Sequence, residues 1–207
     1  MNIKKPSFWD QDKPNFYTYV LYPLTFFIKI NNIFHNYFPK KKIKQIKTIC
    51  VGNIYLGGTG KTPSSVKLYQ LLKADKFNVI IGKKYYSDQK DEQILIKNKS
   101  KLITSKNREE IIKLAVEKNY ELIIFDDGLQ ERKFDYDVKF VCFDSKIWLG
   151  NRNLIPSGPL RESIYSLKKY DGVFLKITDE NSDLDKIFSE IKKVNSKIEI
   201  FNSYVKI

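Results

Sequence analysis

One stretch constrains the fold of this chain more than any other: the sixteen residues TICVGNIYLGGTGKTP at positions 48–63. They consist of a short β-branched run, a glycine-rich turn, and Gly60-Lys61-Thr62 at the start of a helical pattern. Glycines let backbone N–H groups approach phosphate oxygens, and a helix N-terminus adds partial positive charge. The order of strand, loop and helix therefore predicts a phosphate-binding loop.

The residues of this loop divide into backbone donors and side chains with a chemical role. Four positions supply the backbone amides around the phosphates: Gly57, Gly58, Thr59 and Gly60. Lys61 is predicted to neutralise the β- and γ-phosphates of a nucleotide, and the Thr62 hydroxyl to bind Mg²⁺. Tyr55 stands where the pattern G-x-x-x-x-G-K-[ST] has its first glycine. A chance GGTGKT in a loop that binds no nucleotide is the alternative.

A second motif is ELIIFDDGLQ at positions 121–130, an apolar run that ends in Asp126 and Asp127. In a phosphate-loop fold, an Asp at the carboxyl end of a neighbouring strand holds Mg²⁺ or its water shell. If the strand continues through both residues, the two carboxylates point to opposite faces and have different roles. The alternative is a turn without function that begins at Asp-Asp-Gly.

The pattern after Lys47 alternates between short apolar runs and helical stretches. Strands are predicted at 48–51, 78–81, 121–125, 138–143, 172–176 and 197–201. Helices are predicted at 61–74, 107–118, 160–168 and 182–193. The alternation indicates an α/β fold with a mostly parallel sheet and helices on both faces. Cys50 and Cys142 lie in apolar runs, so we expect two buried thiols in a reducing cytoplasm.

The N-terminal segment has a different composition. Residues 1–47 hold nine lysines against Asp10 and Asp12, yet residues 14–28 (PNFYTYVLYPLTFFI) carry no charge. Those fifteen residues would rise about 22 Å as a helix, less than the roughly 30 Å of a bilayer core. Aromatic rings mixed with lysines are typical of a membrane-interface segment. We therefore predict a membrane-associating helix within 1–46 and a P-loop domain over 47–207, the alternative being a helix packed on the domain's own core.

The formal net charge of +13 favours a polyanionic surface as partner. Phospholipid and nucleic acid both fit this charge, and biased codon usage in a Lys-, Asn- and Ile-rich chain would also produce it. A nucleic-acid-associated NTPase is disfavoured, because the four arginines are scattered and no aromatic–lysine platform recurs after residue 47. We therefore expect an anionic lipid surface and no nucleic acid as partner.

Several motifs together resemble the tetraacyldisaccharide 4′-kinase family, the lipid A 4′-kinases of Gram-negative bacteria. The resemblance covers about residues 6 to 178. The segments that carry it are Pro-Ser-Phe-Trp near the start, VGNIYLGGTGKTP, DDGLQ, and LIPSGPLRES followed by Lys-Tyr-Asp. It implies a kinase at the cytoplasmic face of the inner membrane, using ATP and Mg²⁺. Its substrate would be a lipid A disaccharide 1-phosphate, phosphorylated at the 4′-hydroxyl.

The resemblance also implies roles for individual side chains. Lys90-Asp91-Glu92-Gln93 takes the place of a Gly-Asp-Glu-Pro stretch, so Asp91 is predicted to act on the sugar hydroxyl, with Lys61 and Asp126 as further catalytic groups. A carboxylate beside the γ-phosphate would accept the proton of that hydroxyl. Thr62, Asp127 and Glu162 are predicted to hold the metal. Lys83 replaces the Arg of a Ser-Arg-Gly-Tyr-Gly motif and loses a bidentate phosphate contact.

Two departures from the family pattern bear on activity. Glu131 follows DDGLQ where the family has His, and the single histidine of the chain is His35 in the N-terminal segment. The family continues into a second lobe, whose Phe-Pro-Asp-His-His motif supplies a partner for the catalytic Asp. We therefore expect a fragment or truncated gene product. The alternatives are half of a split enzyme, completed by a lobe in trans, and a reduced version of the enzyme. An inactive membrane-bound nucleotide-binding relic is the alternative function.

Overall fold

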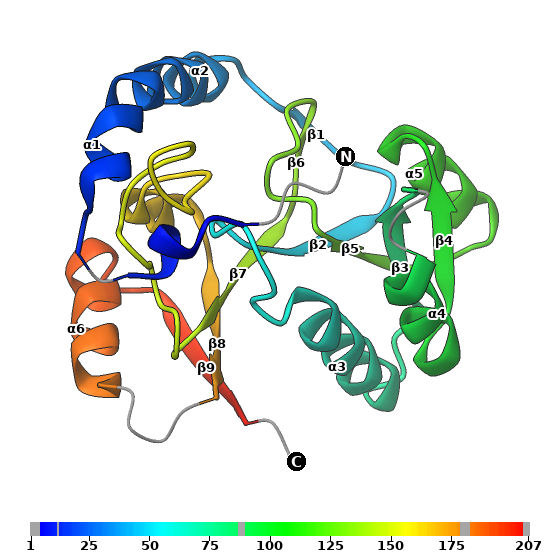
Figure 1. The fold of residues 1–207 in the computed structure, drawn as a ribbon. Coiled ribbons are helices and arrows are strands. Elements are labelled where there is room, and N and C mark those ends of the chain that lie inside the picture. Colours follow the sequence, from blue (N-terminus) through cyan, green and yellow to red (C-terminus); the bar gives the residue numbers. More distant parts are fainter. Residues whose placement is uncertain (1–4, 12, 87–89, 179–182, 205–207) are drawn as a thin grey trace.

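The computed structural model describes residues 5–11, 13–86, 90–178 and 183–204. Its strands are β1 (Lys41–Lys42), β2 (Lys47–Gly52), β3 (Val79–Lys84), β4 (Leu102–Ser105), β5 (Leu122–Asp126), β6 (Phe134–Asp135), β7 (Val138–Asp144), β8 (Gly172–Ile177) and β9 (Glu199–Tyr204). Seven of them form one sheet in the order β4-β3-β5-β2-β7-β8-β9, with every neighbouring pair parallel (Figure 1). The short strands β1 and β6 form a separate parallel pair.

Helices cover both faces of this sheet. They are α3 (Lys61–Ala74), α4 (Lys90–Lys99), α5 (Arg108–Glu117), the 3₁₀ helix η3 (Ile164–Lys169) and α6 (Leu184–Val194). One core cluster contains buried side chains of α3 and α4, and a second contains those of α5 and α6. The predicted α/β class, with a mostly parallel sheet and flanking helices, is confirmed.

Several elements differ from the sequence prediction. The strand β4 and the helix α4 were not predicted, because few of their side chains are apolar and buried. The helix predicted over 160–168 is wrong, since only η3 forms there. Leu160 forms isolated bridges with Tyr55 and Leu154, and the Arg161 amide donates to the Ile54 carbonyl at 2.7 Å. These tertiary contacts hold the backbone outside a helical conformation.

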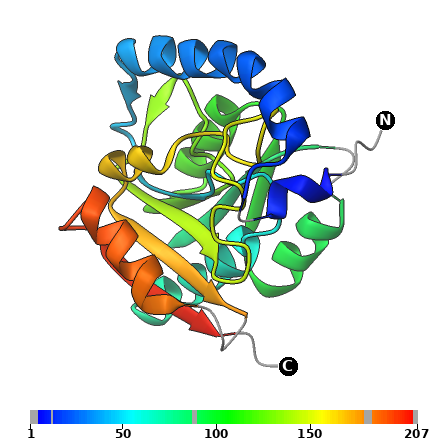
Figure 2. The ribbon, with the colours of Figure 1, turned by 60° about the vertical axis from the view of Figure 1, so that its left-hand side comes forward.

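The N-terminal segment contains η1 (Ser7–Asp10), α1 (Phe16–Leu21), η2 (Tyr22–Leu24) and α2 (Thr25–Tyr37). In Figure 2, α1 and α2 lie across the top of the molecule. Asn15 begins α1 with a capping box, because its side chain accepts from the Thr18 amide while the Thr18 hydroxyl accepts from the Asn15 amide. Within the described residues, no helix combines the length and the apolar character that crossing a bilayer requires.

Polar contacts connect this segment to the rest of the chain. The indole of Trp9 is buried and donates to the Pro156 carbonyl at 3.0 Å. The Asn32 amide of α2 donates to the Arg161 carbonyl at 2.9 Å. The outward side of the two helices is apolar and exposed, with these side chains: Phe16, Tyr17, Tyr19, Val20, Phe26, Phe27, Ile30, Ile33, Phe34 and Tyr37.

Candidate functional site

The glycine-rich loop connects the end of β2 to the start of α3, at the carboxyl edge of the parallel sheet. Gly60 is the N-cap of α3 and has a φ of 83°, in the left-handed region that favours glycine. The buried side chain of Asn53 supports the loop from below, donating to the Gly57 carbonyl at 3.0 Å and the Thr59 hydroxyl at 2.9 Å. The first N–H groups of α3 therefore lie beside a loop that Asn53 holds by two hydrogen bonds, as suits phosphate binding.

The carboxylate of Asp126, at the end of β5, is completely buried and accepts three hydrogen bonds. Thr62 and Ser65 of α3 donate from their hydroxyls, at 2.9 Å to Oδ2 and 3.0 Å to Oδ1. Lys83 of β3 donates from Nζ to Oδ2 at 2.6 Å. Asp126, for which a catalytic role was predicted, is thus the carboxylate that contacts the proposed metal-binding hydroxyl of Thr62.

Lys83 is 2% exposed and also pairs with Glu92 of α4, whose side chain is 51% exposed, at 2.6 Å. Burial by itself lowers the pKa of Lys83, but the two carboxylates outweigh it, so the pKa lies above its ordinary value. The sequence indicated only that Lys83 lacks the bidentate phosphate contact that an Arg would make. The structure instead places its ammonium group between two carboxylates.

Asp127 follows the strand in the left-handed region, with a φ of 61°. Its amide donates to the Val51 carbonyl at 2.8 Å, so the turn after β5 is joined to the end of β2. Its Oδ1 lies 3.8 Å from Lys61 Nζ and 3.7 Å from Arg161 Nη1. This oxygen is buried and has no hydrogen-bond donor among the described residues. Asp126 and Asp127 therefore have different partners, although both face the loop.

The donor set at the loop fits a hard divalent cation. The hydroxyl of Thr62 and the carboxylate of Asp127 are oxygen ligands of the kind that Mg²⁺ prefers, and Asp126 accepts from that hydroxyl. The buried Oδ1 of Asp127 lacks a hydrogen-bond donor, as an oxygen reserved for a cation would. In the described residues no three His, Cys, Asp or Glu side chains form a metal-binding group. Mg²⁺ in phosphoryl-transfer sites keeps several waters and phosphate oxygens, so it requires no such group.

Two predicted site residues lie apart from the loop contacts. Asp91 is exposed in the first turn of α4, directly before Glu92. Glu162 accepts from the Tyr170 hydroxyl at 3.3 Å and lies 3.7 Å from Lys169 Nζ. Within the described chain, no hydrogen bond or ion pair joins either carboxylate to Lys61 or Thr62. Glu162 does line a cavity of about 260 Å³ together with Arg161 and residues of α2.

Tyr55 is buried and connects the loop to the N-terminal segment. Its hydroxyl donates to the Asp10 carboxylate and accepts from Lys5 Nζ at 2.6 Å. Lys5 also pairs with Asp10, and its ammonium group lies 4.6 Å from the centroid of the Tyr55 ring. The residue that departs from the glycine pattern therefore fastens residues 5–10 to the start of the loop. No local pattern indicated this contact, because about 45 positions separate the partners.

The fold and this site define the class of P-loop nucleotide-binding proteins. A family model described as tetraacyldisaccharide-1-P 4′-kinase matches residues 18–205. The chain belongs to this family, as its motifs indicated.

Relatives in the curated collections carry the same description. The tetraacyldisaccharide 4′-kinase of Pelagibacter ubique is 41% identical over 200 residues, which are 97% of this chain and 63% of that protein. The kinase of the same description from Rickettsia bellii is 35% identical over 173 residues, 76% of this chain and 53% of that protein. The chain thus spans less than two thirds of the length of these relatives.

Solved structures agree with the family and the fold. The 4′-kinase LpxK of Aquifex aeolicus, crystallised in complex with ATP, has a TM-score of 0.66 and 26% identity. The match covers 76% of this chain and 58% of that one. The hydrogenase maturation factor HypB of Archaeoglobus fulgidus has a TM-score of 0.50 and 10% identity, covering 77% of this chain and 82% of that one, and shares the fold alone.

Proposed function

We propose that this chain is the nucleotide-binding part of an ATP-dependent lipid kinase. It transfers the γ-phosphate of ATP to the 4′-hydroxyl of a tetraacyldisaccharide 1-phosphate, a step of lipid A biosynthesis. The chain is a member of the 4′-kinase family. The observation that carries the proposal is that Lys61 and Thr62 of its loop lie beside Asp127 and Asp126. ATP in the related Aquifex structure supports the choice of nucleotide.

The side chains at the loop have complementary roles in this reaction. Lys61 and the amides of Gly57 to Gly60 bind the phosphates. Thr62, Asp127 and Glu162 are the proposed ligands of Mg²⁺, and Asp126 holds the Thr62 hydroxyl in place. When bound, Mg²⁺ supplies positive charge for the oxygens of the transferring phosphoryl group.

Asp91 is proposed to accept the proton of the sugar hydroxyl. A carboxylate can do this as the oxygen–phosphorus bond forms, provided that the acceptor oxygen reaches it directly or through a water molecule. Its position on an exposed turn of α4 leaves it accessible to a large substrate. In the family, a His from a second lobe assists this residue, and such a lobe would act in trans or within a longer chain.

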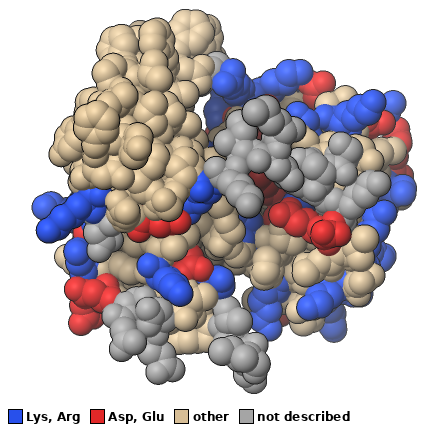
Figure 3. All heavy atoms as spheres, in the orientation of Figure 1, with Lys and Arg blue, Asp and Glu red and all other residues tan. Residues whose placement is uncertain are grey.

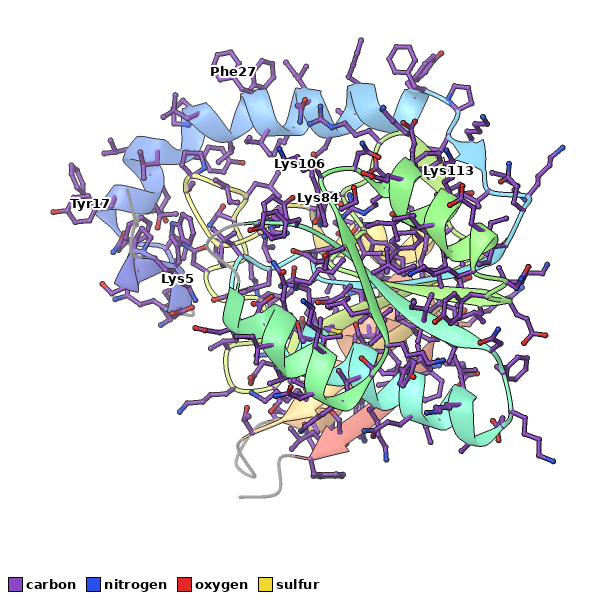
Figure 4. The ribbon with its side chains drawn as sticks, turned by 90° about the vertical axis from the view of Figure 1, so that its right-hand side faces the viewer. Lys5, Tyr17, Phe27, Lys84, Lys106 and Lys113 are labelled. Atoms are coloured by element: carbon purple, nitrogen blue, oxygen red, sulfur yellow. The ribbon has the colours of Figure 1, made fainter. Side chains whose placement is uncertain are left out.

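The apolar side of α1 and α2 is proposed to lie in the cytoplasmic surface of the inner membrane. Figure 3 shows a broad area without charged side chains over these helices, while blue and red residues cover much of the remaining face. Tyr17 and Phe27 point away from the body of the molecule in Figure 4. Exposed lysines follow α2 directly, namely Lys40, Lys41, Lys42 and Lys44. Rings at headgroup depth and ammonium groups on anionic lipid together bind such surfaces.

The test is transfer of labelled γ-phosphate from Mg-ATP to a tetraacyldisaccharide 1-phosphate in detergent micelles. We expect Lys61→Ala to abolish transfer, because its side chain acts on phosphate and not on the core. Lys67→Ala is the matched control, since Lys67 is exposed on the same helix, and it should leave transfer unchanged. Equal turnover by Lys61→Ala and the parent chain would remove Lys61 from the mechanism. ATP binding without any transfer would instead mean that this chain is a fragment, half of a split enzyme or a nucleotide-binding relic.

A further inference from the structure

Lys83 is a buried charge in a sheet whose other central residues are mostly apolar. It is the fifth residue of β3 and is the register partner of Asp126 on the neighbouring strand β5. Side chains of register partners in adjacent strands point to the same face, so the ammonium group of Lys83 reaches the Asp126 carboxylate directly. The pairing at 2.6 Å therefore follows from the parallel register of β3 and β5.

The same ammonium group also reaches a different element. Its second short contact, at 2.6 Å, is with Glu92 in the first turn of α4. Glu92 directly follows Asp91, which the proposed function makes the proton acceptor. A continuous series of hydrogen bonds thus runs from the Thr62 hydroxyl through Asp126 and Lys83 to the helix that carries Asp91.

The chemistry of the site explains why a lysine suits this position. The Asp126 carboxylate is completely buried, and its other two donors are neutral hydroxyls. A buried carboxylate without a positive partner is strongly destabilised. An ammonium group has three donors and a positive charge, so it can donate to two carboxylates at once and also offset their charge, which a neutral amide cannot do.

We propose that Lys83 is a positioning residue that holds Asp126 against Thr62 and, through Glu92, fixes the turn of α4 that carries Asp91. The inference rests on the proposed function for the role of Asp91. In this role Lys83 binds neither the substrate nor the phosphates. Lys83 thereby keeps Thr62 and Asp126, which lie at the nucleotide, at a constant distance from Asp91, which acts on the acceptor hydroxyl. The rate of an in-line transfer depends on this distance.

Glu92→Gln tests the arm toward α4 without disturbing the core, because Glu92 is half exposed. We expect Mg-nucleotide affinity within about twofold of the parent chain and kcat for transfer lowered about tenfold. We also expect faster amide hydrogen exchange in the first turn of α4. Glu109→Gln is the matched control, since Glu109 lies in the first turn of α5 and pairs with Lys133 at 3.5 Å. It should change none of these three quantities. Unchanged kcat and exchange in Glu92→Gln would overturn the proposal.

Variants of Lys83 test the arm toward Asp126. We expect Lys83→Met to weaken Mg-nucleotide binding at least about tenfold, whereas Lys83→Arg, which keeps the charge, should retain affinity within about threefold. Adding Glu92→Gln to Lys83→Met should then cause no additional acceleration of exchange in α4, because the connection is already broken. Equal affinities for Lys83→Met and Lys83→Arg, or additive effects in the double variant, would contradict the proposal.

These measurements separate the inference from the proposed function. Nucleotide binding and hydrogen exchange require no lipid acceptor. A parent chain that transfers no phosphate would show that this chain does not catalyse the reaction by itself, while the affinity of Lys83→Met and the exchange of Glu92→Gln would still decide the positioning role. If Lys83→Met does not fold, the Glu92→Gln result alone decides it.

Discussion

Single residues of the site differ in how far they could be predicted. Lys61, Thr62 and Asp126 were predicted because each lies in a local motif, and the structure brings all three to one edge of the sheet. Lys83 and Tyr55 were not recognised as structural connections, because their partners are distant in sequence. Local patterns report secondary structure and loop chemistry, whereas contacts across strands depend on the register of the sheet.

Glu131 stands where the family has His, and its contacts give it a structural role in the turn after β5. Its carboxylate accepts from the Arg108 guanidinium at 2.8 Å and from the amides of Arg132 and Lys133 at 2.8 and 3.0 Å. Arg108 also donates to the Asp127 carbonyl at 2.6 Å. Glu131 therefore stabilises the turn that presents Asp127 to the loop.

This environment predicts a pH-dependent stability. Burial by itself raises the pKa of Glu131, but two backbone amides and the Arg108 guanidinium outweigh it, so the pKa lies below its ordinary value. A carboxyl with a lowered folded-state pKa stabilises the fold above its unfolded value and loses this contribution as pH falls through the folded value. Glu131→Gln should lower the free energy of unfolding by about 1–2 kcal/mol at pH 7. The difference from the parent chain should shrink below pH 4.5.

Urea denaturation at pH 7 and near pH 4 measures this difference. Glu109→Gln provides the control, because the Glu109 side chain is 59% exposed and its ion pair should contribute little. A deficit of Glu131→Gln that is equal at both pH values would show that charge is not the cause.

Elements also differ in how strongly the sequence specifies them. The helix α3 begins and ends where it was predicted, because Gly60 and the loop fix its start and its pattern continues to Ala74. The helix α4 has mostly charged or exposed positions and buries Gln93 and Ile96, so its periodicity is weak. Residues 160–168 have a helical composition, but backbone bonds to Ile54 and Asn153 hold the first two residues outside a helix, and only the 3₁₀ helix η3 forms. Tertiary contacts thus decide the elements whose own patterns are weak.

The contact between η1 and the loop leads to a prediction at this scale. Tyr55→Phe removes the hydroxyl that holds Asp10 and Lys5, and it should raise the rate of proteolysis within the first 15 residues several-fold. Nucleotide affinity should fall, because the start of the loop loses its support.

Limited proteolysis with and without Mg-ATP measures both effects. Tyr19→Phe is a suitable control, since Tyr19 is exposed on α1 and should tolerate the loss of its hydroxyl. Identical cleavage of Tyr55→Phe and the parent chain would show that the hydroxyl cluster does not hold the segment.

At the scale of the whole molecule, many of the exposed apolar side chains gather on α1 and α2. The apolar residues of α1 and α2 occupy one side, and the lysine excess gives the chain a net charge of +13. The sequence predicted the class of the fold from its alternating pattern, but the arrangement of the N-terminal helices on the core depends on contacts such as Trp9 to Pro156. Those contacts join residues nearly 150 positions apart, and no local pattern reports them.

Vesicle binding is expected to depend on the apolar side more than on charge alone. Replacing Phe26 and Phe27 by Ser should weaken binding to anionic vesicles by about tenfold or more, because both rings are largely exposed on α2. Sedimentation with vesicles that contain phosphatidylglycerol measures the affinity. Phe77→Ser is the control, since Phe77 is half exposed after α3. Equal loss in the control, or no loss in the α2 variant, would place the membrane contact elsewhere.

The position of β9 has a practical consequence for work with this chain. Within the described residues β9 pairs with β8 alone, so one side of its backbone offers N–H and C=O groups to another strand. Such an edge is a template for pairing between copies, which leads to aggregation. The excess of lysine opposes this pairing by mutual repulsion, and added salt screens that repulsion. Solubility at high protein concentration should therefore decrease as ionic strength rises.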